Sequence, residues 1–194
     1  MPVQLMRVPM TGGSPELIFS MREFSSSFCA RPPSHLCAVA ETIADRKQTI
    51  VSVFDPVKGR GPELARFDLD PVPNEDHWPL CDISSDGTRL VISPSPEGPI
   101  QIRSLRNHSA RVIRVKGLNN MRNLGWTGDG KGLLVSTSSM EGNLLLHVDL
   151  QGRTQVLRRC SEGQGCYGGS SPDGRHLAIY DWKLSSNMWM MENF

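Results

Sequence analysis

The sequence has no long hydrophobic run and no excess of charge of either sign, and each absence excludes a class of protein. No window approaches the roughly 18 continuous apolar residues of a membrane span. The 21 basic residues nearly balance the 20 acidic ones, so no overall field favours nucleic acid or an anionic membrane. We therefore expect no nucleic-acid binding and no membrane insertion by this segment. Basic side chains such as Arg103, Arg106, Arg158 and Arg159 are expected to be a solvated face.

Motifs of catalysis and of metal or cofactor binding are also lacking. The five histidines form no H-E-x-x-H arrangement, and the five cysteines form no C-x-x-C pair. Residues 163–168 match G-x-G-x-x-G, but we expect a strand after them, whereas the dinucleotide fingerprint needs a helix there. The acidic segment 68–77 lacks the spacing and glycine of an EF-hand loop. The sequence predicts no catalytic residue, no cofactor-binding residue and no metal ligand, and hence a protein that is not an enzyme.

The N-terminal residues lack the basic head and apolar block of a secretory signal peptide. If Met1 is the true start, we expect a cytoplasmic protein. If the chain is a fragment of a longer exported or membrane-anchored protein, a periplasmic or other extracytoplasmic location is expected instead. Cys160 and Cys166 enclose a short glycine-bearing loop and could form a disulfide in an oxidising compartment. The alternative is that the cysteines are small buried hydrophobic residues.

What the sequence does contain is a recurring bend before a short apolar run. Asp-Gly pairs at 86–87, 129–130 and 173–174 precede the apolar runs 90–92, 133–135 and 177–180. The aspartates are 43 (129 − 86) and 44 (173 − 129) positions apart, a period typical of repeat architectures. Aspartate can bond the backbone two residues on, and glycine supplies the positive φ of the turn. We therefore expect Asp86, Asp129 and Asp173 to close hairpins and not to catalyse a reaction.

Four short strands per unit predict an all-β fold, a β-propeller of four-stranded antiparallel blades. No segment has the 3.6-residue pattern of a helix, and an immunoglobulin-like sandwich does not predict equally spaced bends. In the first unit, residues 31–34 replace the Asp-Gly bend. Two alternatives stay open: a ring closed by strands from both termini, or a truncated, open propeller. The single domain, 1–194, divides into a half blade 1–19, three complete blades 24–67, 78–115 and 121–158, and a blade 165–194 that lacks its last strand.

The last unit, Ser171-Pro172-Asp173-Gly174-Arg175-x-Leu177-Ala178, resembles the repeat of the TolB-like, WD-repeat-like bacterial β-propellers. Residues 5–13 look like the outer half of such a blade, and the resemblance extends over nearly the whole chain. Propellers of that family are often appended to kinases, winged-helix regulators or peptidases. The resemblance implies the C-terminal propeller portion of a multidomain bacterial protein, with a protein partner or a covalently linked upstream domain.

Loops on a rigid scaffold carry function, so we expect a non-catalytic interaction or sensor module for signalling or scaffolding. It would bind a protein or a small ligand through end-face loops, first of all 41–48 and 68–77. One alternative is the propeller domain of a larger enzyme, a serine peptidase or serine/threonine kinase, whose catalytic domain is absent from this chain. Another is a TolB-like periplasmic scaffold. Trp78, Trp126 and Trp189 are expected to fill space between blades. No feature specifies an oligomeric state.

Overall fold

The computed structural model describes residues 2–32, 34–43, 47–69, 79–139, 142–160 and 164–183. These residues form strands, turns and connections, and none of them lies in a helix, so no helix that could cross a membrane is found among them. The strands are β1 (Val3–Arg7), β2 (Glu16–Met21), β3 (Phe24–Cys29), β4 (Cys37–Ile43), β5 (Gln48–Asp55), β6 (Gly59–Asp68), β7 (Leu80–Ile83), β8 (Arg89–Ser93), β9 (Ile100–Ser104), β10 (Ala110–Ile113), β11 (Met121–Trp126), β12 (Gly132–Ser139), β13 (Gly142–Asp149), β14 (Thr154–Cys160), β15 (Gln164–Ser170) and β16 (Leu177–Lys183).

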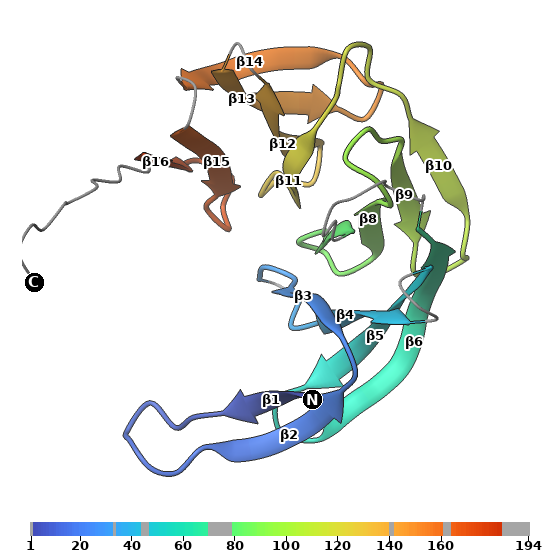
Figure 1. Cartoon of the computed structure of the whole chain (residues 1–194), viewed down its shortest axis with the longest axis vertical. Coiled ribbons are helices and arrows are strands. Elements are labelled where there is room, and N and C mark those ends of the chain that lie inside the picture. Colours follow the sequence, from blue (N-terminus) through green and yellow to red (C-terminus); the bar gives the residue numbers. More distant parts are fainter. Residues whose placement is uncertain are drawn as a thin grey trace, which may run out of the picture.

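Three four-stranded antiparallel sheets make up most of the structure. Their strand orders are β3-β4-β5-β6, β7-β8-β9-β10 and β11-β12-β13-β14, so each sheet is a simple meander. The sheets stand side by side around a common centre, with the first strand of each innermost and the last outermost (Figure 1). Radially arranged four-stranded meanders are propeller blades. The predicted all-β propeller with four-stranded antiparallel blades is therefore confirmed. We call these three sheets blades 1, 2 and 3.

Two-stranded sheets stand at the two ends of the arc that the blades form. One is β1–β2, which contacts β6 of blade 1, and the other is β15–β16, which packs on blade 3 (Figure 1). No pairing joins these two sheets to each other in the part of the chain that the structure describes. The described strands thus form an open arc, as in the second of the two alternatives. The part of the expected last blade, 165–194, that follows Lys183 lies outside the described residues.

The longest strand of blade 1, β6, begins directly after a tight turn, at Gly59. The Asp55 carboxylate accepts hydrogen bonds from the N–H groups of Val57 and Lys58, at 2.7 and 2.9 Å, and Gly59 has a φ of 90°. This tight turn starts the pairing of β5 with β6 at once.

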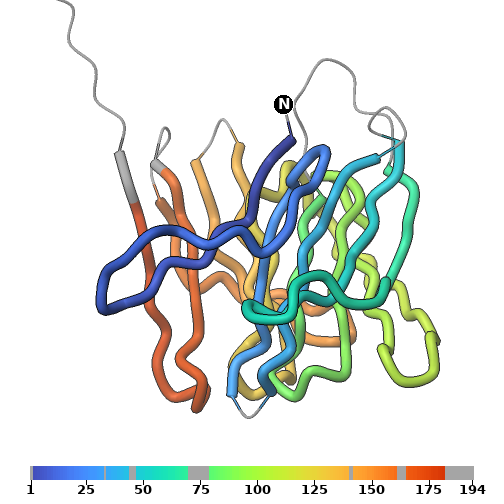
Figure 2. Tube along the Cα trace, turned by 90° about the horizontal axis from the view of Figure 1, so that it is seen from below, coloured from blue at the N-terminus to red at the C-terminus, as the bar shows by residue number. Residues whose placement is uncertain are grey.

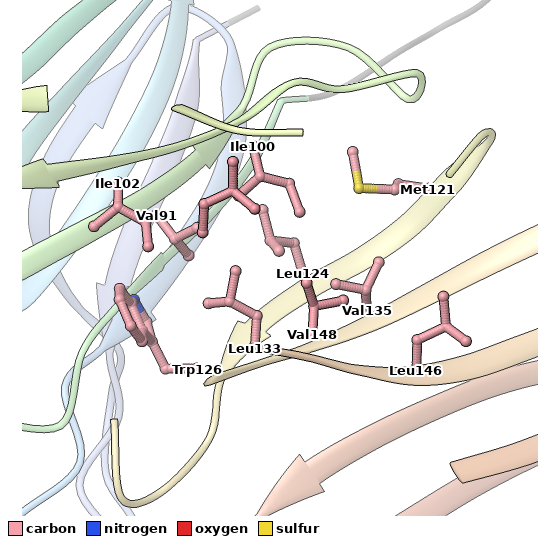
Figure 3. Packing of buried hydrophobic residues seen from close by; sticks show 11 residues of the cluster. Val91, Ile100, Ile102, Met121, Leu124, Trp126, Leu133, Val135, Leu146 and Val148 are labelled. Carbon is pink, nitrogen blue, oxygen red and sulfur yellow. The ribbon is translucent and has the colours of Figure 1, made fainter. Parts of the chain in front are cut away.

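Apolar side chains from neighbouring blades meet in layers, and these layers are the core. Between blades 2 and 3, Ile100, Ile102 and Val91 face side chains of β11, β12 and β13 (Figure 3). Trp126 lies in this layer and is fully buried, which confirms the space-filling role expected for it. A second layer joins blades 1 and 2 through residues of β4, β6 and β8. Trp78 and Trp189 lie outside the described residues.

Two disulfides are present, one of which the sequence suggests. Cys160 at the end of β14 bonds to Cys166 on β15, which ties the last two-stranded sheet to blade 3. Cys29 bonds to Cys37 across the β3–β4 hairpin, a pair that the sequence pattern did not indicate. The second pair closes the hairpin that has no Asp-Gly bend. Only Cys81 is a free thiol among the cysteines, all five of which are described.

Candidate functional site

The three Asp-Gly bends have the same hydrogen-bond pattern, which begins with a hydroxyl two residues before each aspartate. That hydroxyl donates to the aspartate Oδ1, at 2.5 Å from Ser84, 2.7 Å from Thr127 and 2.5 Å from Ser171. The same Oδ1 accepts the N–H two residues further on, at 3.0 Å in all three bends. The hydroxyl oxygen also accepts the N–H five residues after it. Each bend is a closed network of local bonds.

These networks stabilise the charged form of the bend aspartates. The Thr127 hydroxyl and the Lys131 N–H lower the pKa of Asp129, and the Ser171 hydroxyl and the Arg175 N–H lower that of Asp173. The pKa of Asp86 is lowered as well, because bonds from the hydroxyl of Ser84 and the N–H of Thr88 outweigh its desolvation. A carboxylate whose pKa is lowered in this way is a poor base. The geometry thus assigns these three residues to the turns.

The bends also lie against one another along one end of the molecule, at the lower edge of Figure 2. A Cβ on Gly128 would lie 2.3 Å from the Ser171 carbonyl oxygen, and one on Gly87 would lie 2.3 Å from the Ser34 Oγ. Arg89 donates to the Gly130 carbonyl oxygen at 2.9 Å. Each bend is therefore both a turn within its blade and a contact with the next blade.

A pocket of about 340 Å³ opens on the inner wall of the arc, where the innermost strands β3, β7, β11 and β15 are neighbours. Its polar lining includes Ser26 and Ser27 of β3, Asp82 of β7 and Asn123 of β11. Arg31, which follows β3, adds a cation. The remaining lining residues are Phe28, Pro79, Leu80, Cys81, Leu124, Gly125 and Gly168. We call this cavity the inner-wall pocket, and it is the candidate functional site.

Asp82 is the acidic group of the inner-wall pocket, and both of its carboxylate oxygens are engaged. Oδ2 accepts the N–H of Trp126 at 2.8 Å, and Oδ1 accepts the N–H of Ile83 at 2.9 Å. Burial raises the pKa of Asp82 to about 6, although these two bonds and the nearby Arg31 charge act in the opposite direction. The carboxylate therefore joins blade 2 to blade 3 at the inner wall of the arc.

Trp126 connects the same region to two arginines. Its carbonyl oxygen accepts a bond from Arg31 Nη1 at 3.1 Å, and its indole N–H donates to the Asp82 carbonyl oxygen at 3.2 Å. The Arg89 guanidinium lies 4.4 Å from the centre of the indole ring, within the range of a cation–π contact. Residues of blades 1, 2 and 3 thus meet at one tryptophan, and two of its partners, Arg31 and Asp82, line the inner-wall pocket.

Two smaller groups indicate what the inner-wall pocket can do. Burial, with a smaller contribution from the Asp82 charge, raises the pKa of the Cys81 thiol, so the thiol stays neutral near pH 7. The Ser26 hydroxyl is buried and has no hydrogen-bond partner among the described residues. A neutral thiol is a weak nucleophile, while an unsatisfied buried hydroxyl favours a bound polar group. The pocket is thus suited to binding.

The sequence pattern did not single out the residues of the inner-wall pocket. Of the expected binding loops, the structure describes residues 41–43, 47–48 and 68–69, and the rest lies outside the described residues. Glu41 is buried at the end of β4 and forms a salt bridge with Arg60. Residues 164–170 form a strand, so the G-x-G-x-x-G match opens no helix. The missed signal was Asp82, a charge within the apolar strand 80–83.

Comparisons with known proteins place this geometry in one fold class, the β-propellers. The structure is similar to TolB from Acinetobacter baumannii, with 17% identity, a TM-score of 0.66, and coverage of 95% of this chain and 44% of that one. It is also similar to the putative TolB from Agrobacterium tumefaciens, with 14% identity, a TM-score of 0.67, and coverage of 93% and 63%. A chain of the nidogen/laminin complex matches at 10% identity with a TM-score of 0.57, over 91% of this chain and 74% of that one. The fold is therefore that of a TolB-like β-propeller.

The likeness rests on structure alone and concerns the fold. No protein-family model matches the chain. No curated protein matches it either. The chain spans 44% and 63% of the lengths of the two TolB structures. Among the described residues, no group of three or more His, Cys, Asp or Glu side chains could hold a metal ion.

Proposed function

We propose that this chain is a non-catalytic binding module whose ligand occupies the inner-wall pocket. The observation that supports this most directly is the convergence of polar groups from blades 1, 2 and 3 on one cavity of about 340 Å³. A concave site with a few convergent polar groups is typical of small-ligand recognition. The buried Ser26 hydroxyl, unpartnered among the described residues, favours a ligand that supplies a hydrogen-bonding group.

The chemistry of the lining favours binding over catalysis. Both carboxylate oxygens of Asp82 accept backbone N–H groups, so this residue has a structural task at neutral pH. The raised pKa of Cys81 keeps its thiol protonated and weakly nucleophilic. None of the four histidines that the structure describes lines the pocket. The end-face loops 41–48 and 68–77 stay a second predicted binding surface.

The cysteine pairing favours an oxidising compartment. Four of the five cysteines are paired in two disulfides, which involve Cys29 on β3 and Cys166 on β15. Disulfides persist outside the cytoplasm and are rare within it. We propose an extracytoplasmic location for this segment, as expected for part of an exported protein.

A thermal-shift experiment tests the binding site. Wild-type protein is screened with amino acids, small dicarboxylates and short peptides, beside Ser27→Phe, which fills the pocket from the exposed side of β3. The matched control is Gln155→Phe, an equally large substitution at an exposed position of β14. We expect at least one probe to raise the Tm of wild type and of Gln155→Phe and to leave that of Ser27→Phe unchanged. Equal shifts in all three proteins, or no shift in any, would overturn the proposal.

A further inference from the structure

The balanced net charge of the chain conceals a basic region on its second half. Between residues 100 and 160 there are ten basic residues and three acidic ones. Some of these basic side chains are engaged locally. Arg153 pairs with Asp149, Arg158 pairs with Asp181, and Arg103 donates to the Arg66 carbonyl oxygen at 3.2 Å. Three of the cations without a printed carboxylate partner, Arg111, Arg114 and Lys116, lie on the outermost strand of blade 2 or directly after it.

Arg111, Arg114 and Lys116 are all exposed, and none of them forms a salt bridge with another described residue. Val112 stands between them with 45% of its surface exposed. The turn of blade 3 at Gly152 packs on the Arg114 backbone, since a Cβ there would lie 2.8 Å from the Arg114 carbonyl oxygen. We call Arg111, Val112, Arg114 and Lys116 the β10 edge surface.

A second cavity adjoins the β10 edge surface. It has a volume of about 290 Å³ and lies between the 97–100 segment and residues 113–118. Ile100 and Ile113 form a buried apolar floor, and Val115 and Leu118 form half-buried walls. Arg114 stands at its rim. The cavity can therefore accept one aliphatic or aromatic side chain of a bound molecule. Acidic groups beside that side chain would lie close to Arg114.

The backbone of β10 determines what kind of molecule fits. β10 ends its sheet, so its outer edge has no paired strand among the described residues. The Ser104 N–H donates to the Ser109 carbonyl, and the register pairs Ala110 with Arg103 and Val112 with Gln101. By the alternation of an antiparallel ladder, the N–H and C=O groups of Ala110 and Val112 point to the open edge. An extended peptide backbone carries donors and acceptors at the spacing that matches both kinds of group.

We propose that the β10 edge surface docks an extended acidic segment of a partner protein. The segment adds a strand to β10, sets carboxylates against Arg111, Arg114 and Lys116, and places one apolar side chain in the adjacent cavity. Strand addition of this kind takes its affinity from main-chain bonds and its specificity from alternate side chains. A lipid headgroup or a nucleic acid would satisfy the charges but not the strand edge. The surface is distinct from the inner-wall pocket, because β7 and β10 are the opposite edges of blade 2.

The test uses fluorescence anisotropy with a labelled short peptide that alternates glutamate and valine and carries one leucine. We expect the wild-type protein to bind it. The double variant Arg114→Glu/Lys116→Glu should bind it at least about tenfold more weakly, equivalent to about 1.4 kcal/mol. Arg106→Glu makes the same change of charge on the exposed β9–β10 turn, remote from the cavity, and should alter the affinity less than about twofold. Arg111→Glu is the second variant should the double variant fold poorly.

Backbone pairing is tested with two further peptides, N-methylated at odd or at even positions. One of the two should lose at least about tenfold in affinity, because a strand pairs through only one of its edges. Equal binding of the methylated and unmethylated peptides would overturn the strand addition. The proposal also fails if the peptide does not bind, or if phosphatidylserine vesicles or duplex DNA bind in its place and lose affinity in Arg114→Glu/Lys116→Glu.

Discussion

The contact between successive bends can be tested with a single methyl group at Gly128. This residue is buried, and its φ is not in the left-handed region, so alanine is compatible with its backbone conformation. An added Cβ would nevertheless lie 2.3 Å from the Ser171 carbonyl oxygen and 2.9 Å from the Gly174 Cα. Both obstacles are backbone atoms, so the bend of the next sheet must move. Overpacking of this kind costs about 2 kcal/mol, which for a chain of this size lowers Tm by roughly 4–8 °C.

Gly169→Ala is the matched control for Gly128→Ala. Gly169 also has a φ outside the left-handed region, and nothing lies within 4 Å of the position its Cβ would occupy. We expect it to leave the free energy of unfolding unchanged or to raise it slightly, since alanine restricts the unfolded chain. Urea denaturation and calorimetry measure both variants, and native-state hydrogen exchange should show faster exchange in β15 and β16 of Gly128→Ala. If the two variants have the same stability, bend-to-bend contact does not hold the blades together.

Four further predictions concern thiols and carboxylates. Alkylation without reductant should modify Cys81 alone after unfolding, and Cys160→Ser should lower stability by about 2 kcal/mol in a denaturant titration. The pKa of Asp129 is lowered in the fold, so its contribution to stability is present above about pH 4 and is lost as the pH falls through the folded-state pKa. The variant Asp129→Asn should therefore be less stable than wild type at pH 7 and should lose less stability than wild type on acidification. The pKa of Asp82 is raised to about 6, so its contribution to stability falls as the pH rises from about 4 to 6, and its carboxyl carbon resonance should titrate near pH 6.

The fold could be predicted because the bends are local. The hydroxyl, the aspartate and the glycine of a bend lie within four consecutive residues, so their spacing reports the blade period directly. Alternating apolar residues between the bends supply the strands. Blade 1 obscured the pattern, since a proline-containing hairpin and the Cys29–Cys37 disulfide replace its bend. Cys29 and Cys37 stand on either side of this hairpin connection, and that placement is the sequence signal that would have indicated their disulfide.

The candidate sites depend on contacts between distant segments, and these could not be read from one sequence. Arg31 and Trp126 are 95 positions apart, and Asp82 and Trp126 are 44 positions apart, yet they meet at the channel wall. Net charge likewise did not indicate the β10 edge surface. Its basic residues are inconspicuous in the sequence, and only the fold places them beside the open edge of β10 and the adjacent cavity. Which side chains lie close together is a property of the assembled blades.

The stacked bends also give the molecule two unequal ends. At the bend end, every turn is in contact with its neighbour, so an inserted residue in one blade would displace the blade beside it. The connections from β4 to β5 and from β6 to β7 leave from the other ends of their strands, and the chain there varies in length from blade to blade. A residue inserted at the bend end should therefore destabilise the fold more than one inserted at the other end of the strands.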